Sequence, residues 1–460
     1  MALKRYRYRA YPTGEQKQML ARTFGSCRVV FNDFIAERDR LYRAGLHREV
    51  SLTETARLVT TIAKTTPERA WLAEVSAVSL QQAAADAARA YRNFFASLTG
   101  KRRGPKMGLP SRKRRSHRQA ARFTANALKI FDTERLDRSG SKWGRVRLPK
   151  IGDLKYIRSR DLPSKPTSVT MIHELDGTYW VSFVIDEPIA AQAPATRVAA
   201  LDLGLIDLAA IVSVDPETGE AVREKIPNPR PLKAAARRLT RQQRSLDRKR
   251  KGSANWAKVR VRVARIHRKV RDIRADHHHK LAARLVRDHD VLVLETLALA
   301  GMGRTRLAKS IYDAGLGILI RLIKEKAENQ GRTVTRIGWW EPTTQTCSVC
   351  GKPGGKKPLH IREWTCEGCS TRLDRDYNAA VNVFVAAGLA ETLNACGPDV
   401  RHRLAGAVGD EAGTHRTEGR MTTWRRSPRL SGRGGGQNNP PIKPIFLAGG
   451  VRDGVSESSH

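Results

Sequence analysis

Residues 341–384 read EPTTQTCSVCGKPGGKKPLHIREWTCEGCSTRLDRDYNAAVNVF, and the rest of the chain is organised around them. Two Cys-x-x-Cys pairs, Cys347/Cys350 and Cys366/Cys369, are separated by a 15-residue loop rich in Gly and Lys. This spacing is typical of a zinc ribbon with four thiolate ligands, which leave no open coordination position. The sequence therefore predicts a structural Zn²⁺ site here rather than four unpaired thiols, with the intervening loop folded as two short strands.

The second half of this stretch, DRDYNAA at 374–380, indicates the start of a helix. Asp376 lies in it, seven residues after the last cysteine. A ribbon closed by zinc is rigid, so we expect it to hold this carboxylate beside others that come from far upstream.

Two upstream acids lie at the ends of predicted buried strands. The segment RVAALDLGLIDLAAIVS at 197–213 is apolar except at Asp202, Gly204 and Asp207, which predicts two strands joined at a tight glycine turn. The run VLVL after Asp290 predicts another buried strand that ends at Glu295. An unpaired carboxylate in a core costs several kcal/mol. Hydrogen bonds from nearby backbone amides are one way to offset that cost, and a metal ion is the other.

Asp202, Glu295 and Asp376 together form a candidate catalytic site. Two divalent ions about 3.5–4 Å apart need shared carboxylates and little else from a protein. Oxygen ligands favour Mg²⁺ or Mn²⁺ over zinc. One ion would activate a water molecule and the other would stabilise the leaving 3′-oxygen of a phosphodiester. We therefore expect a phosphate backbone as the substrate.

The charge of the chain points to the same class of partner. Its 460 residues include 85 Lys and Arg against 45 Asp and Glu, a formal charge of +40. Such an excess indicates a large polyanion, nucleic acid first and a membrane surface second. No run of about 18 apolar residues is present, so we expect no membrane span. The absence of an apolar stretch near the start predicts no signal peptide, and the isolated Cys27 and Cys396 suit a reducing compartment, here the cytoplasm of a bacterium, near its nucleoid.

The N-terminal part predicts a β-barrel with helices inserted into it. Residues 4–11 alternate cationic with aromatic or apolar side chains, and Asp176-Gly177 lies between two β-rich runs, so we expect strands over 1–12 and 120–187. Helical spacing predicts a helix over 15–43, with Thr13 as N-cap, and a second helical region over 52–98. The basic loop at 100–118 is expected to contact phosphates, and 188–196 is a Pro- and Ala-rich linker.

The second half predicts more helices and a disordered end. Residues 231–288 indicate an antiparallel pair of basic helices that meet along an apolar seam. His277, His278 and His279 lie within the second of them, where three adjacent side chains splay apart instead of converging on a metal. We expect one amphipathic helix over 309–330, a strand over 333–340, and a disordered Gly- and Arg-rich tail over 397–460.

At this point the motifs resemble a known family. LDLGLIDLA, VLVLETL and the two cysteine pairs followed by LDRDYNAAVN are similar, in order and spacing, to the split RuvC nuclease of TnpB proteins. Those proteins are encoded by bacterial insertion sequences and are relatives of type V CRISPR effectors. The opening KRYRYRAYPTGEQKQMLARTFGSCRVVFN also resembles the family, and the likeness covers roughly residues 4–394.

The resemblance implies a multidomain α/β and α+β protein. It implies an RNase H-like (RuvC) nuclease domain over 197–340 and 371–396, interrupted by a zinc ribbon over 341–370 that contacts target nucleic acid. It further implies a wedge β-barrel domain over 1–12 and 120–187, with a helical recognition domain over 13–119 inserted in it. The implied activity is cleavage of double-stranded DNA, directed by a bound guide RNA, next to a short element-associated motif.

The resemblance also assigns roles to single residues. It carries the metal-binding role to Asp202, Glu295 and Asp376, and not to Asp207 or Asp374. This chain departs from the family pattern in two places. Thr296-Leu297 follows Glu295, where an acid or Asn before Leu is common, and Trp339-Trp340-Glu341 replaces a more usual aromatic-aromatic-Pro arrangement.

Two other functions fit parts of the sequence. One is a regulator that binds DNA through a guide RNA or the zinc ribbon without cutting it, as in relatives that have lost their acids. The other is a transposase that joins DNA strands, since that chemistry also uses acids and Mg²⁺. All three acids are present in this chain, which favours the nuclease.

Overall fold

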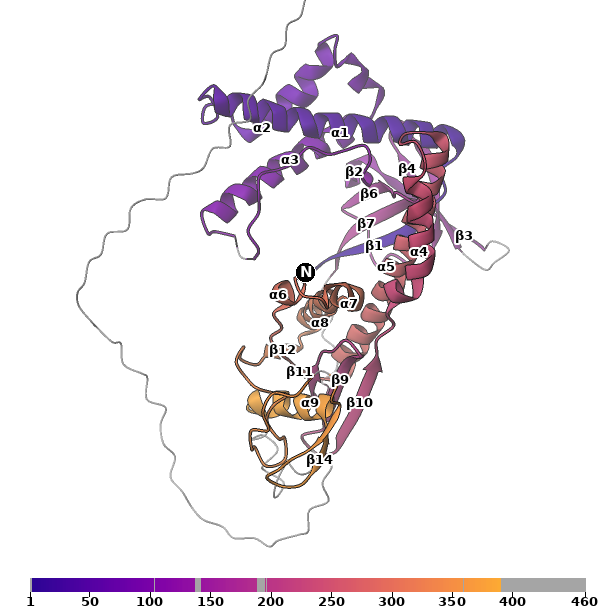
Figure 1. Cartoon of the computed structure of the whole chain (residues 1–460). Coiled ribbons are helices and arrows are strands. Elements are labelled where there is room, and N and C mark those ends of the chain that lie inside the picture. The colour runs from indigo at the N-terminus through magenta and orange to yellow at the C-terminus, as the bar shows by residue number, and fades with distance from the viewer. Residues whose placement is uncertain are drawn as a thin grey trace, which may run out of the picture. The chain divides into compact units, whose positions relative to one another are not determined.

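The computed structural model describes residues 2–389 except 103, 137–141, 188–194, 196 and 359 (Figure 1). Most of the expected linker, Cys396 and the expected tail at 397–460 lie outside these residues. The described part contains a seven-stranded sheet, a five-stranded sheet and a two-stranded hairpin, with helices around them.

The seven-stranded sheet is built from the N-terminal strand and six later ones. Its strands are β1 (Ala2–Ala10), β2 (Gln119–Thr124), β3 (Lys129–Leu136), β4 (Lys142–Leu148), β5 (Gly152–Arg158), β6 (Ser168–His173) and β7 (Tyr179–Glu187). The order is β2-β6-β7-β1-β5-β4-β3, with every pair antiparallel. The predicted capture of β1 and the β6–β7 hairpin are confirmed, and Tyr8, Tyr156 and Phe183 pack together in the core.

This sheet is curled and open where we expected a closed barrel. In the described residues, no pairing joins β2 to β3, the two ends of the order. β1 pairs along its whole length with β7 but with β5 only through Ala10 and Tyr156. The sheet therefore bends at this narrow junction without its edges meeting.

Helices fill the segment between β1 and β2. α1 (Gly14–Arg43) begins with the predicted capping box, in which Thr13 and Gln16 satisfy each other's backbone amides. The predicted region over 52–98 is not one helix. It consists of α2 (Leu52–Arg57), a π-turn η1 (Leu58–Ile62), the 3₁₀ turns η2 (Ala63–Thr65) and η3 (Ala70–Glu74), and α3 (Ala77–Leu98). Pro67 lies in the interruption, where it cannot continue a helix. A further 3₁₀ turn, η4 (Ala125–Ala127), follows β2.

The five-stranded sheet contains the strands expected to carry the acids. Its members are β8 (Val198–Asp202), β9 (Asp207–Val214), β10 (Ala221–Pro227), β11 (Val291–Leu294) and β12 (Thr333–Arg336), in the order β10-β9-β8-β11-β12. β8, β9 and β10 are antiparallel, whereas β11 runs parallel to both β8 and β12. β12 is shorter than the strand predicted over 333–340.

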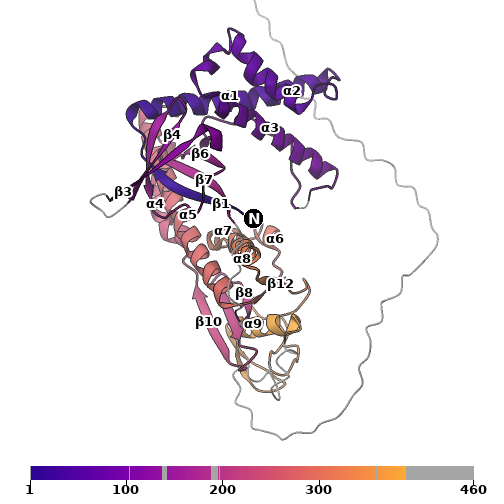
Figure 2. The same cartoon turned by 180° about the vertical axis from the view of Figure 1, so that it is seen from behind.

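Both faces of this sheet are covered by helices, which explains why its strands are apolar throughout. In Figures 1 and 2 the sheet lies between α8 (Leu316–Gln330) and α9 (Arg375–Ala386). Ala199 and Leu201 of β8 pack on the side of α5 (Ala254–Asp288) and α8, and Ala200 packs on the side of α9. The alternation along β8 therefore joins two cores into one domain.

The predicted pair of basic helices is α4 (Pro231–Asp247) and α5, which contact each other along the expected seam. Val259, Ile266 and Val270 are buried there, whereas Ile273 stays exposed. Short helices α6 (Leu299–Met302) and α7 (Ala308–Ala314) come before α8.

The single helix predicted over 309–330 is wrong. Gly315 ends α7 and begins α8 with a left-handed backbone, φ +65°. A Cβ at this glycine would lie 2.6 Å from Cδ of Arg274. Arg274 cannot easily move away, because its Nε donates to the backbone oxygen of Asp313 at 2.8 Å.

Replacing Gly315 with Ala tests this contact, and Gly331→Ala is the matched control. Gly331 also ends a helix at positive φ, +69°, but has nothing within 4 Å of its would-be Cβ. Both substitutions should cost about 1 kcal/mol for the left-handed backbone. Gly315→Ala should cost about 1–3 kcal/mol more because of overpacking. Urea unfolding measures the two, and equal losses would contradict the contact.

Candidate functional site

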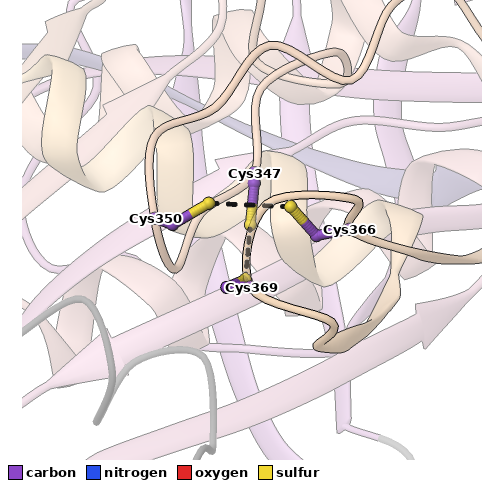
Figure 3. A group of neighbouring side chains, drawn as sticks. All are labelled: Cys347, Cys350, Cys366 and Cys369. Carbon is purple, nitrogen blue, oxygen red and sulfur yellow. Dashed lines mark hydrogen bonds between the residues drawn. The ribbon is translucent and has the colours of Figure 1, made fainter.

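The four predicted zinc ligands meet at one point. All their sulfurs lie within 4.8 Å of one another. Figure 3 shows the four side chains converging, with Cys347 and Cys369 Sγ 3.8 Å apart and Cys350 and Cys366 Sγ 3.6 Å apart. Zn–S bonds of about 2.3 Å place the sulfurs of a tetrahedral site about 3.8 Å apart. The donor set and its spacing therefore fit a structural zinc ion.

Each cysteine pair is held by a tight turn of the same kind. The amide of Cys347 donates to the oxygen of Lys352, and the amide of Cys366 donates to that of Thr371. The residue after the second cysteine of each pair has positive φ, +77° at Gly351 and +55° at Ser370. These turns aim both sulfurs of a pair at the same point.

The ribbon's two strands differ from the prediction. β13 (Glu363–Thr365) and β14 (Arg372–Asp374) pair across the second cysteine turn, rather than both lying in the loop between the two pairs. β14 therefore leads directly into α9, whose N-cap is Asp374. This arrangement couples the ribbon to the helix that carries Asp376.

Asp202 and Glu295 are neighbours at the same edge of the sheet. β8 and β11 are parallel, and Leu201 pairs in register with Leu294, the residue that precedes Glu295. Asp376 lies in the first turn of α9, which packs against β8. The three acids therefore come together from two strand ends and one helix start, as the sequence predicted for their local context.

The acids also interact electrostatically. The pKa of Asp202 is raised well above its ordinary value, first by burial and then by the negative charges of Glu295 and Asp376. Burial likewise raises the pKa of Glu295, whose carboxyl shares a hydrogen bond with that of Asp202. In the described residues, only the four sulfurs lie within 4.8 Å as a full set, so the carboxylates are spaced more widely, as a site for two ions allows. Crowded, poorly hydrated carboxylates are suited to a divalent cation.

Two cations, which the sequence did not single out, lie beside Asp376. Nη1 of Arg362 is 3.2 Å from Oδ1 of Asp376, and Nζ of Lys225 is 3.8 Å from its Oδ2. Lys225 is also 2.6 Å from Asp374. Burial acts against the charge of Lys225, yet the hydrogen bond to Asp374 and the nearby carboxylates raise its pKa overall. These cations offset part of the negative charge on the helix side of the site.

Two asparagines fasten the ribbon to α9, and sequence reasoning missed them as well. Nδ2 of both Asn378 and Asn382 donates to the backbone oxygens of Thr343 and Thr346. Oδ1 of Asn378 accepts from the amide of Ser348. Their i,i+4 spacing in an otherwise apolar helix was the available signal, because two amides on one face of a buried helix need partners.

Cationic side chains line a groove between α4 and α5. Its volume is about 520 Å³, and its walls include Arg238, Arg241, Arg262, Arg265, Arg268 and Lys269. The groove has the spacing and charge to follow a phosphate backbone. The histidine triplet lies farther along α5, where Nε2 of the buried His278 is 2.9 Å from the oxygen of Ala314.

Among the described residues no helix is both long and apolar enough to cross a membrane. A sulfur-lined ribbon, a cluster of interacting acids and a cationic helix pair define a metal-binding protein suited to nucleic acid.

Comparison with known proteins identifies the family. A family model described as "Probable transposase", OrfB of IS605, matches residues 182–306. A Cas12f1-like TNB domain model matches 317–383, and a helix-turn-helix model matches 1–47. A Streptomyces pristinaespiralis protein named as an RNA-guided DNA endonuclease is 37% identical over 402 residues, 86% of this chain and 91% of its own length. The chain belongs to this family, the TnpB proteins of IS605-type elements.

More distant relatives span a similar share of the chain. Escherichia coli K12 InsQ, also named as an RNA-guided DNA endonuclease, is 27% identical over 418 residues, 87% of this chain and 95% of InsQ. A solved structure of Cas12f1 with its sgRNA and target DNA has a TM-score of 0.47 and 11% identity, covering 83% of this chain and 98% of that one.

Serine at Cys350 tests the zinc assignment. We expect wild-type protein to contain one zinc per chain and Cys350→Ser to lose most of it, because structural sites need all four ligands. Cys27→Ala, which removes a buried thiol outside the ribbon, should keep its zinc. Elemental analysis after dialysis measures both. Full zinc content in Cys350→Ser would contradict the assignment.

Proposed function

We propose that this chain is an RNA-guided DNA endonuclease whose RNase H-like (RuvC) domain hydrolyses phosphodiester bonds at Asp202, Glu295 and Asp376. The observation that carries the proposal is the mutual interaction of these carboxylates at the adjacent ends of β8, β11 and α9. The sheet order, three antiparallel strands followed by two parallel ones, supports the RNase H-like assignment.

The donor set fits Mg²⁺ or Mn²⁺, which bind carboxylate oxygens. When bound, such ions would supply an activated water and stabilise the leaving 3′-oxygen. Asp202 and Glu295 would hold them from the sheet edge, and Asp376 from the helix start. Arg362 and Lys225 would keep Asp376 oriented and attract the DNA backbone toward the site.

The remaining parts of the chain would bind the nucleic acids. The α4–α5 groove and the basic loop at 100–118 suit a guide RNA and a double-stranded DNA target. Base pairing between guide and target would select the sequence, while the protein would read a short adjacent motif and the shape of the heteroduplex. We assign the wedge domain to 1–12 and 120–187, the recognition domain to 13–119, and the target-binding ribbon to 341–370. The site of action would be the bacterial cytoplasm, at the nucleoid.

Removing any one of the three acids should abolish cleavage and leave RNA binding intact. Asp202→Ala, Glu295→Ala and Asp376→Ala complexes, purified with their RNA, are incubated with duplex DNA matching the guide and Mg²⁺. We expect at least 1,000-fold slower cutting, about 4 kcal/mol of lost transition-state stabilisation. Asp288→Ala, which removes a surface acid paired with Arg287, is the control. Cutting by all three variants at the wild-type rate would rule out this site.

The same experiment separates the rival functions. Bound target without cleavage in wild-type protein, under Mg²⁺ or Mn²⁺, would indicate a regulator. Joined products from labelled element ends would indicate a strand-transferring transposase.

Crowding of the acids predicts a stability effect that does not depend on activity. A carboxyl whose pKa is raised by folding stabilises the fold at low pH and loses that contribution as pH rises through the raised pKa. Metal-free wild type should therefore lose stability as pH rises above about 4, and Asp202→Asn should weaken this loss.

Thermal unfolding in magnesium-free buffer measures this effect, without a chelator so that the ribbon keeps its zinc. At pH 7.5, Asp202→Asn should melt higher than wild type. Added Mg²⁺ should raise the melting temperature of wild type and have less effect on the variant. Asp288→Asn should behave as wild type. An identical response of Asp202→Asn and wild type to pH and Mg²⁺ would contradict the proposed ion site.

A further inference from the structure

Two adjacent tryptophans lie in solvent close to the acids. The Trp340 side chain is 89% exposed and that of Trp339 is 52% exposed, and Trp340 is the most exposed large apolar residue in the described part of the chain. Indole rings are among the most favourable groups to bury. Two neighbouring exposed ones therefore indicate a surface that takes a partner.

The start of the tryptophan loop is fixed to the residues on either side of Glu295. The amide of Ile337 donates to the oxygen of Leu294 at 3.1 Å, and the hydroxyl of Thr296 donates to the oxygen of Ile337 at 2.7 Å. Trp340 is three residues beyond Ile337, so their Cα atoms are at most about 11 Å apart. The exposed rings therefore lie near the strand end that carries Glu295.

The end of the loop is fixed to the helix that begins beside Asp376. Asn378 and Asn382 of α9 both donate to the oxygen of Thr343. Only residues 338–342 lie between this anchor and Ile337. The two tryptophans are thus on a short segment held at both ends by elements that carry the candidate catalytic acids, and the identity of residue 296 matters because Thr296 makes one of the holding bonds.

The charge around the loop indicates what kind of partner it takes. Arg336, just before the loop, is exposed and has no ion-pair partner among the described residues. Arg362 and Lys225 lie on the other side, at Asp376. Apolar ring faces between cations match a single nucleic-acid strand, whose bases stack on aromatic side chains while its phosphates meet the cations. Bases within a duplex are already stacked and would not offer free faces.

We propose that Trp339 and Trp340 form a stacking platform for unpaired bases of the DNA strand that is being cut. This inference rests on the proposed nuclease function. The acids fix the position of one phosphate, and the platform would fix the direction of the strand on one side of it. Stacking tolerates any base, so it suits an enzyme whose sequence choice is made by its guide RNA.

The test uses the RNA-bound protein and a matched DNA duplex, with single-turnover cleavage rates as the measurement. We expect Trp340→Ala, and more so the Trp339→Ala/Trp340→Ala double variant, to cut roughly 5- to 100-fold more slowly, the range typical of lost base stacking. Trp340→Phe should keep most of the rate because it retains a ring. Trp71→Ala is the matched control, since Trp71 is 39% exposed but lies in the helical segment between β1 and β2.

Abasic nucleotides identify the stacked bases. Each position within five nucleotides of the mapped cut is replaced in turn by an abasic one, which removes the base and keeps the phosphate. One or two positions should slow wild type, and at those positions the double variant should show no further loss. Additive losses at every position, or unchanged rates in the tryptophan variants, would overturn the platform.

Two further results have defined meanings. If sedimentation shows that the alanine variants change the oligomeric state and the rate loss follows it, the tryptophans form an interface between copies, and the platform is overturned. If wild type fails to cut any matched DNA, the proposed function fails and this inference with it. Wild-type cutting with unaffected variants overturns the inference alone.

Discussion

Repulsion among three carboxylates is the constraint on which the nuclease half of this protein depends. Asp202, Glu295 and Asp376 are brought close enough to raise the pKa of Asp202. Nothing about that cluster favours folding by itself, so the surrounding elements must hold it. The parallel pairing of β8 with β11 fixes two of the acids, and the apolar packing of α9 against the sheet fixes the third.

The zinc ribbon supports that arrangement from outside the sheet. Its second strand runs straight into α9, and Asn378 and Asn382 fasten the segment before the first cysteine pair back onto the same helix. The helix is therefore held both by its own chain and by side-chain hydrogen bonds to the ribbon. A buried amide without its partner costs about 1–3 kcal/mol, so these bonds resist separation of ribbon and helix. The structural metal and the catalytic acids are parts of one mechanical unit.

The features that could be predicted from the sequence are those with local causes. The alternation in β1, the capping box at Thr13, the Gly204 turn and the four-cysteine spacing each depend on a few adjacent residues, and all are found. The break at Gly315 was missed because apolar spacing continues across it, and only the packed Arg274 shows why glycine is required. Lys225 was missed because its partner Asp374 is 149 residues away. Closure of the N-terminal sheet depends on long-range register, which periodicity does not contain.

The helical hairpin of α4 and α5 is a detour between two strands of the nuclease sheet. Its tip, at Lys251-Gly252, is exposed, and a side chain at Gly252 would touch nothing. The ends of the hairpin meet the sheet, but its tip does not take part in aligning β10 with β11. Evolution can therefore lengthen or shorten this arm by whole helical turns, and so adapt the protein to RNA scaffolds of different size, while the cutting chemistry stays untouched.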